Sequence, residues 1–81
     1  MPSAVIVINS EIGRESEVFE KLVGFSEVEC AYIVFGVYDI VAKCNAVDME
    51  ALEELISERI RRVSSVRSTL TLIVSREICK E

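Results

Sequence analysis

Residues 28–46 read VECAYIVFGVYDIVAKCNA, and this stretch decides the fold. β-Branched and aromatic residues are frequent on both sides of Gly36, which is typical of two strands. Because glycine adopts backbone conformations that other residues avoid, Gly36 favours a tight hairpin between them. We therefore predict one strand over residues 28–35 and a second over residues 38–46.

The segments on either side of this hairpin predict two further strands and two helices. The β-branched run at residues 4–8 is typical of a central strand buried on both faces, and residues 66–74 form a last strand. Apolar residues at helical spacing predict a helix from Arg14 to Gly24 and another after Asp48, a favourable N-cap. Their apolar stripes comprise Val18, Phe19, Leu22 and Val23, and then Leu52, Leu55, Ile56, Ile60 and Val63.

The predicted elements follow the order β-α-β-β-α-β with short connections. Right-handed crossovers place both helices of such a chain on one face of an antiparallel sheet. The sequence therefore predicts an α+β, ferredoxin-like sandwich of the dimeric alpha-beta barrel type, with four strands in the order 4-1-3-2. The 81 residues suffice for one domain, which we expect to span residues 1–81.

Alternation along the strands predicts which side chains lie under the helices. In the hairpin, we expect the apolar set there: Ala31, Ile33, Phe35, Tyr38, Ile40, Ala42 and Cys44. The opposite face then carries Tyr32, Val34, Asp39, Val41, Lys43 and Asn45. In the last strand we expect Leu70, Leu72 and Val74 under the helices, and Arg67, Thr69, Thr71 and Ile73 on the opposite face. That mixture of apolar and polar side chains suits a protein interface with a polar pocket.

The composition predicts an oligomer and excludes a membrane protein. Hydrophobic residues make up 51% of the chain, more than is usual for a soluble domain, so one face should be buried against a partner. The longest apolar runs, residues 4–8 and 70–74, fall far short of the roughly 20 residues that span a bilayer. The N-terminus has no features of a signal peptide, and we expect a cytoplasmic protein.

The charged and reactive residues argue against several functions. A net charge of −5 argues against direct nucleic-acid binding. The chain has no histidine, the commonest general base, so we expect no enzyme. Its three cysteines, Cys30, Cys44 and Cys79, are too far apart in sequence to indicate a zinc site or a disulfide framework, and we expect no metal and no cofactor.

Two segments give the chain a family resemblance. Residues 35–39, Phe-Gly-Val-Tyr-Asp, match the Gly-x-(Tyr/Phe)-Asp turn of the RAM domain, named for regulation of amino-acid metabolism. Residues 66–71, Val-Arg-Ser-Thr-Leu-Thr, match the final-strand pattern Val-x-x-(Thr/Ser)-x-Thr of that domain. The similarity extends over roughly residues 4–74. The chain thus resembles the ligand-binding half of Lrp/AsnC transcriptional regulators, in a stand-alone form without their N-terminal helix-turn-helix.

What this resemblance implies is an effector-binding and assembly module that modulates transcription indirectly. Such domains form homodimers through the sheet, can form rings of four dimers, and can co-assemble with full-length regulators. Amino acids bind near the two motifs, which correspond here to Gly36, Val37, Tyr38, Asp39, Ser68, Thr69 and Thr71. Asp39 can accept a hydrogen bond from a ligand ammonium, while the threonine hydroxyls and turn amides can donate to a carboxylate.

Each of these residues also has a purely structural interpretation. Asp39 can bind the amides of its own turn, and Tyr38 can serve in packing. Thr69 and Thr71 are ordinary strand formers. Two other functions therefore remain open beside amino-acid sensing, namely a ligand-free assembly module and a small dimeric ferredoxin-like enzyme.

Overall fold

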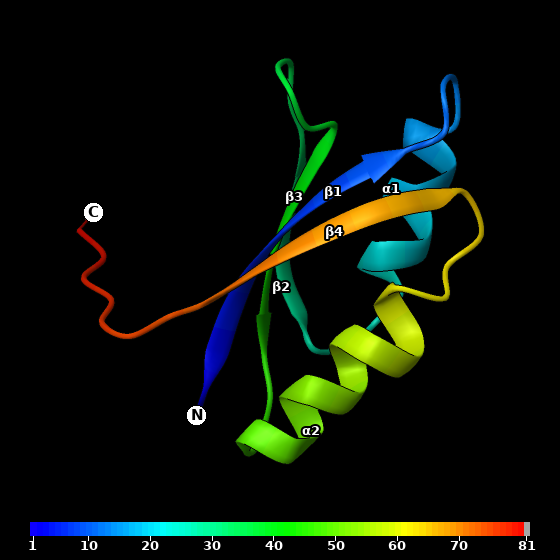
Figure 1. Cartoon of the computed structure of the whole chain (residues 1–81). Helices are drawn as coiled ribbons and strands as arrows, with labels where there is room; N and C mark the ends of the chain where they lie inside the picture. Colours follow the sequence, from blue (N-terminus) through cyan, green and yellow to red (C-terminus); the bar gives the residue numbers. More distant parts are fainter. Residues whose placement is uncertain (81) are drawn as a thin grey trace.

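The computed structural model describes residues 1–80 and contains the predicted elements in the predicted order (Figure 1). They are β1 (Ser3–Ser10), α1 (Glu15–Val23), β2 (Val28–Ile33), β3 (Ile40–Asn45), α2 (Met49–Glu54), the π-helical segment η1 (Leu55–Ile60) and β4 (Val66–Ile73). The segment η1 continues α2 directly, because Glu54 and Leu55 at the junction both have helical backbone angles. Among residues 1–80, no helix is long and apolar enough to cross a membrane.

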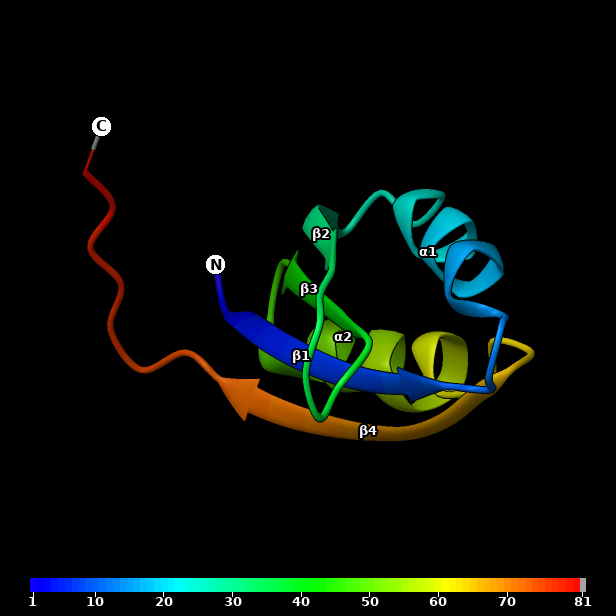
Figure 2. The same cartoon turned by 90° about the horizontal axis from the view of Figure 1, so that it is seen from above.

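The four strands form one antiparallel sheet in the order β2-β3-β1-β4, which confirms the predicted topology. Strand β1 lies inside the sheet between β3 and β4, so β2 and β4 are the two edge strands. Both helices lie on the same face of the sheet (Figure 1), and the segment after β4 leads away from it (Figure 2). The other sheet face is not covered by any element of residues 1–80.

The core lies between the helices and the covered face of the sheet. Strand β1 contributes Ala4, Ile6 and Ile8, which are fully buried, while Val5 and Val7 between them point to the other face. The helices bury most of their predicted stripes, the exceptions being Val23, which is exposed, and Phe19 and Val63, which are partly buried. Asp48 caps α2 as predicted, because its carboxylate accepts a 2.8 Å hydrogen bond from the Ala51 backbone N–H.

The predicted orientation of the last strand is wrong. Ile6 and Ile8, which face the helices, lie opposite Thr71 and Thr69 of β4, so both threonines face the helices. Val7 and Val5 lie opposite Leu70 and Leu72, which therefore point to the uncovered face. The prediction assumed that apolar residues of β4 belong in the core. It failed because the uncovered face of this sheet is itself apolar.

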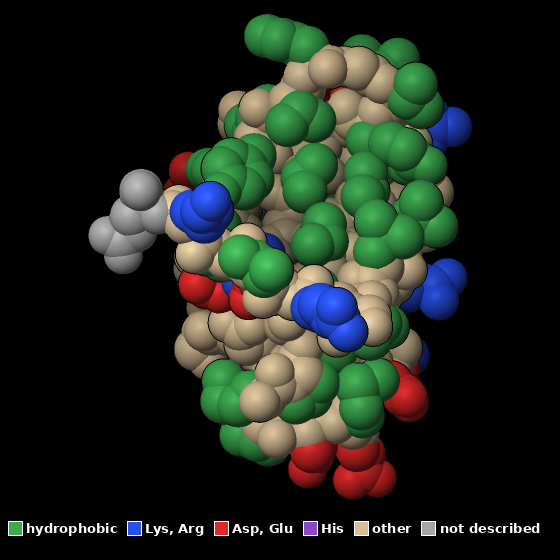
Figure 3. Space-filling model, turned by 90° about the vertical axis from the view of Figure 1, so that its left-hand side faces the viewer, with side chains coloured by type: hydrophobic (Ala, Val, Ile, Leu, Met, Phe, Trp, Pro, Cys, Tyr) green, Lys and Arg blue, Asp and Glu red, His purple; other side chains and the backbone are tan. Residues whose placement is uncertain are grey.

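The uncovered face presents a continuous row of apolar side chains. Tyr32 pairs with Val41, Val41 with Val7, and Val7 with Leu70, so the row crosses all four strands. We call the surface formed by Val5, Val7, Tyr32, Val41, Leu70 and Leu72 the open face. Hydrophobic side chains gather in the view of Figure 3, which is taken from the side away from the helices. Tyr32, Leu70 and Leu72 are 56%, 46% and 51% exposed, so substantial apolar area meets solvent.

The hairpin is longer than predicted. Strand β2 ends at Ile33, which pairs with Ile40 at the start of β3, so residues 34–39 form the connection. Phe35 is fully exposed at its tip and Tyr38 is half-buried in the loop, so neither continues a strand under the helices. Gly36 has a φ of +151°, and no atom lies within 4 Å of where its Cβ would be. The backbone angle, not a lack of space, therefore requires glycine at this position.

Candidate functional site

The structure brings the hairpin loop next to the end of β1 and the start of β4. Between them lies a hollow of about 450 Å³ at one end of the sheet. Four separate segments contribute to its walls: the end of β1, the β1–α1 loop, the hairpin and the start of β4. The lining residues are Asn9, Ser10, Ile12, Val37, Asp39, Arg67 and Ser68. We call this space the Asp39 hollow.

Asp39 is fixed to β1 by backbone and side chain together. Its backbone N–H donates to the Ile8 carbonyl at 3.0 Å, and its own carbonyl accepts from the Val34 N–H at 2.9 Å. Carboxylate oxygen Oδ2 accepts from the Ser10 N–H at 2.9 Å and from the Ser10 hydroxyl at 3.4 Å. Within residues 1–80, oxygen Oδ1 accepts no hydrogen bond. Asp39 thus has a structural role and still offers one oxygen to a ligand.

Arg67 enters the hollow through an irregularity in the sheet. Asn9 pairs with Ser68 and Ser10 pairs with Val66, so Arg67 is an extra residue without a partner on β1. Such a β-bulge bends the strand and redirects a side chain, and bulges are frequent next to functional sites. Arg67 is exposed and is the only cationic residue in the lining. The ion pairs found within residues 1–80 do not involve it.

The β1–α1 loop supplies an apolar rim. Ile12 is 95% exposed, and Val37 from the hairpin, which also lines the hollow, is 86% exposed. The loop is held in place by the Glu11 N–H, which donates to the Ser65 carbonyl at 2.8 Å. Ser65 has a φ of +77°, a conformation that costs a non-glycine residue about 1–2 kcal/mol. The connection before β4 is therefore strained at the residue that anchors this rim.

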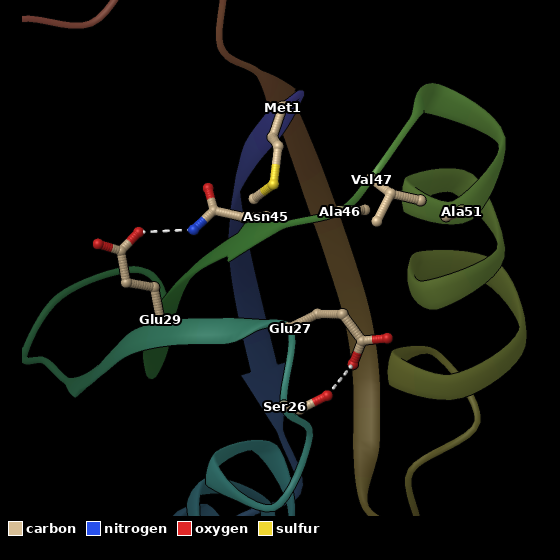
Figure 4. A pocket seen from close by; sticks show the side chains of 8 residues that line it. All are labelled: Met1, Ser26, Glu27, Glu29, Asn45, Ala46, Val47 and Ala51. Atoms are coloured by element: carbon tan, nitrogen blue, oxygen red, sulfur yellow. Dashed lines mark hydrogen bonds between the residues drawn. The ribbon is translucent and has the colours of Figure 1, made fainter.

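A second hollow, of about 490 Å³, lies at the opposite end of the sheet (Figure 4). Its lining comprises Met1, Ser26, Glu27, Glu29, Asn45, Ala46, Val47 and Ala51. Glu29 accepts a 2.8 Å hydrogen bond from Asn45, and Glu27 accepts from Ser26 and from Arg59. Because both carboxylates are already paired, this hollow is a weaker candidate than the one beside Asp39.

The ionic contacts of the second hollow shift several pKa values. The hydrogen bond from Arg59 is the main reason why the pKa of Glu27 lies below its usual value, and Arg59 also stacks over the Phe25 ring at 5.4 Å. Asn45 and then Lys43 lower the pKa of Glu29. Glu77, beyond β4, raises the pKa of Lys43 through a hydrogen bond. Through its pairs with Glu29 and Glu77, Lys43 links β2, β3 and the segment after β4.

The thiols and carboxylates do not form a metal centre in the part of the chain described. Among residues 1–80, no group of three or more His, Cys, Asp or Glu side chains is placed to hold a metal ion. Cys44 is buried in the core, and burial raises the pKa of its thiol to about 11. It is therefore a small core residue, not a reactive thiolate.

The family model of the Lrp/AsnC ligand binding domain matches residues 3–81, nearly the whole chain. The chain belongs to this family. An uncharacterized HTH-type transcriptional regulator of Pyrococcus horikoshii is 32% identical to this Lrp/AsnC domain over 72 residues, which cover 89% of the chain and 46% of the regulator. The chain thus spans about half the length of the curated relatives it matches.

Solved structures agree with this assignment. The crystal structure of FFRP-DM1 superposes on this Lrp/AsnC domain with a TM-score of 0.89 and 36% identity, covering 91% of this chain and 99% of that one. A transcriptional regulator from Neisseria meningitidis, crystallised in complex with L-Met, has a TM-score of 0.84. It is 18% identical, covers 98% of this chain and 53% of that one, and so shares the fold.

The structure brings together only some of the predicted ligand-binding residues of this Lrp/AsnC domain. Val37, Asp39 and Ser68 line the Asp39 hollow. Gly36 and Tyr38 belong to the same hairpin loop but are not in the lining. Thr69 and Thr71 face the helices, and Thr71 instead borders a shallow hollow against η1. Within one chain the threonine hydroxyls therefore do not converge with Asp39.

Four lining residues of the hollow were not predicted as ligand contacts: Asn9, Ser10, Ile12 and Arg67. The predicted first strand was recognised only by its apolar run at residues 4–8, and Arg67 was placed simply on the sheet face opposite the helices. In the structure β1 extends to Ser10, and Asn9 near its end donates to the Ser68 hydroxyl at 3.4 Å. A polar pair at the end of an otherwise apolar strand was the available signal.

Proposed function

We propose that this Lrp/AsnC domain binds a free amino acid in the Asp39 hollow and thereby acts as the effector-sensing part of transcriptional regulation. The observation that carries the proposal is the half-satisfied carboxylate of Asp39, held by Ser10 through Oδ2 with Oδ1 facing no donor among residues 1–80. An amino acid's ammonium is a suitable donor for that oxygen, and a charge-assisted bond of this kind is stronger than a neutral one. The membership of the family supports a ligand-binding role.

The same proposal gives the open face a role in assembly. Apolar side chains that run across all four strands suit face-to-face packing of two sheets better than contact with water. A second copy of the chain is the occupant we propose, which makes a homodimer. Dimers that associate further, as rings of four dimers or with full-length regulators, would transmit ligand binding to proteins that contact DNA.

Support for an amino-acid ligand also comes from a distant relative by fold. The Neisseria meningitidis regulator was crystallised with L-Met, an amino acid. At 18% identity this likeness carries no site residue to the present chain. The ligand assignment therefore depends on the charges in the Asp39 hollow.

A second candidate function is a ligand-free assembly module. It is favoured by the bond between Asp39 and Ser10, because a residue that fastens the hairpin to β1 needs no ligand to explain it. In that case the open face alone would carry the function, through a second copy or a full-length regulator. The two candidates differ in whether any amino acid stabilises the folded protein.

A thermal-shift screen against the twenty amino acids, with light scattering on the same samples, separates the two candidates. A ligand at about 100 times its Kd adds roughly 2.7 kcal/mol to the free energy of unfolding. For a domain of this size that is a rise in Tm on the order of 10 °C or more. One or a few stabilising amino acids would support sensing. A folded oligomer that no amino acid stabilises would leave assembly as the function.

A further inference from the structure

We propose that Arg67 is the carboxylate anchor of the Asp39 hollow, and that the ligand is a zwitterion with an uncharged, apolar side chain. This inference rests on the proposed function and adds a binding residue and a ligand class to it. The Val-x-x-(Thr/Ser)-x-Thr pattern leaves position 67 unspecified, so the family resemblance does not assign Arg67 a role.

The bulge in β4 places Arg67 at the hollow. The bulge between the Asn9–Ser68 and Ser10–Val66 pairs releases Arg67 from the regular alternation of β4. Its side chain lines the same hollow as Asp39, which comes from a different part of the chain. The hollow therefore has one anionic and one cationic residue among its seven lining residues.

Arg67 forms no ion pair among residues 1–80, although the chain is rich in acidic residues. The sequence has 14 acidic and 9 basic residues, yet none of the ion pairs within residues 1–80 includes Arg67. Arg59 and Lys43, by contrast, are each bound to glutamates. The guanidinium therefore has its fork of N–H donors available for a carboxylate.

The two charges together select a zwitterion. The ammonium of an amino acid can donate to Asp39 Oδ1 while its carboxylate accepts a bidentate pair from Arg67. A simple cation would leave Arg67 unpaired, and a simple anion would lie next to Asp39 without a compensating ammonium. A simple cation would thus pair with Asp39 but lie close to the cationic Arg67. A simple anion would pair with Arg67 but lie close to the anionic Asp39.

The rim then restricts the ligand's side chain. Ile12 and Val37 are the apolar residues of the lining, and both are almost fully exposed. A ligand side chain that covers them removes apolar surface from water if it is itself apolar. A second carboxylate or ammonium would lose hydration against Ile12 and Val37 without gaining a new partner of opposite charge.

Calorimetric titrations of the full chain test the inference, with L-leucine, L-isoleucine, L-methionine, L-glutamate, L-lysine and L-leucinamide as ligands. L-Leucinamide keeps the ammonium and side chain of leucine but has no carboxylate. The variant is Arg67→Gln, and the matched control is Arg61→Gln, which changes an exposed arginine outside the hollow. Tm and far-UV circular dichroism verify that both variants are folded.

We expect the three apolar amino acids to bind the wild type at least tenfold more tightly than glutamate, lysine or leucinamide. Arg67→Gln should weaken the apolar amino acids at least tenfold, leave leucinamide unchanged and remove the preference for a carboxylate. Arg61→Gln should match the wild type. Tighter binding of glutamate or lysine, or apolar affinities unchanged in Arg67→Gln, would overturn this inference while leaving amino-acid binding intact. Failure of all twenty amino acids to stabilise the wild type in the thermal-shift screen would overturn the proposed function, and this inference with it.

Discussion

The Ser10 backbone N–H donates a 2.9 Å hydrogen bond to Asp39 Oδ2, across 29 residues of sequence. This bond fastens the loop between β2 and β3 to the end of the central strand β1. Ser10 is almost completely buried, so its N–H has little access to water and depends on Asp39. The same carboxylate borders the Asp39 hollow. Because Oδ2 binds Ser10 and Oδ1 accepts no hydrogen bond within residues 1–80, substitutions can separate the structural role of Asp39 from its proposed binding role.

Two substitutions at Asp39 separate these roles. Asp39→Asn keeps an oxygen for the Ser10 N–H but removes the charge, so we expect nearly unchanged stability and amino-acid affinity at least tenfold weaker. Asp39→Ala also leaves the Ser10 N–H unpaired, and it should lower the free energy of unfolding by about 1–3 kcal/mol. Urea denaturation and calorimetry measure the two quantities.

Asp48→Asn is the matched control for the binding experiment. Asp48 accepts a backbone N–H bond of 2.8 Å, much as Asp39 does, but it caps α2 away from the hollow. Asparagine is an equally good N-cap, so this variant should keep both stability and affinity. Wild-type affinity in Asp39→Asn would mean that Asp39 is a turn residue only.

A single lysine on the open face should break the proposed dimer. Leu72 and Val23 are both 51% exposed, but Leu72 lies on the open face and Val23 on α1. Leu72→Lys would bury a charge between two sheets, whereas Val23→Lys adds a charge that remains in water. At micromolar concentration we expect a monomer mass for Leu72→Lys and a dimer mass or larger for Val23→Lys and the wild type. A dimer in Leu72→Lys would place the interface elsewhere.

The ion pair between Arg59 and Glu27 should make part of the free energy of unfolding sensitive to acid pH. Arg59 lowers the pKa of Glu27, so the folded state favours the charged carboxylate. The resulting stabilisation is present above the pKa of an ordinary glutamate, about 4.3, and is lost as the pH falls through the lower folded pKa. Glu27 is partly exposed, so we expect about 1 kcal/mol or less from this pair.

Two single variants and the double variant isolate this contribution to stability. Glu27→Gln and Arg59→Gln each remove the pair, and both should show a shallower loss of stability between about pH 5 and pH 3 than the wild type. The double variant should resemble either single variant, because the pair is already broken. Urea denaturation at a series of pH values measures this. Single variants as steep as the wild type would show that the acid sensitivity arises at other groups.

Periodicity and turn chemistry were sufficient to predict the fold. The run at residues 4–8 identified the central strand, Asp48 identified the start of α2, and the order of elements gave the sheet topology. The faces of β3 were also correct, because Ile40, Ala42 and Cys44 form a purely apolar set that only the core can bury. The interior strands could thus be assigned from the spacing of their apolar residues.

The edge strand β4 shows where this reasoning fails. Alternation gives two sets of side chains but does not say which set faces the helices, and the apolar Leu70 and Leu72 were assigned to the core. Next to β4 both faces of the sheet are apolar, because β1 presents Ile6 and Ile8 to the helices and Val5 and Val7 to the uncovered face. The partly covered positions under the helices tolerate Thr69 and Thr71, whose methyl groups suit a strand.

The candidate site was only partly predictable for a related reason. The hairpin motif identified Asp39 and Val37, and the final-strand motif identified Ser68. The role of Arg67 depends on a bulge of one residue, which no spacing in the sequence reveals. Ser10 and Ile12 join the hollow through the pairing of distant segments, and this required the structure.

The most direct test of amino-acid binding in the Asp39 hollow is a titration of ¹⁵N-labelled protein with the most stabilising amino acid, followed by amide chemical shifts. The proposal predicts that the largest changes occur at residues lining the hollow, with Ser10, Val37, Asp39 and Arg67 foremost. The largest changes at Glu27, Glu29 and Val47 of the second hollow would contradict it, and so would a spectrum that no amino acid changes.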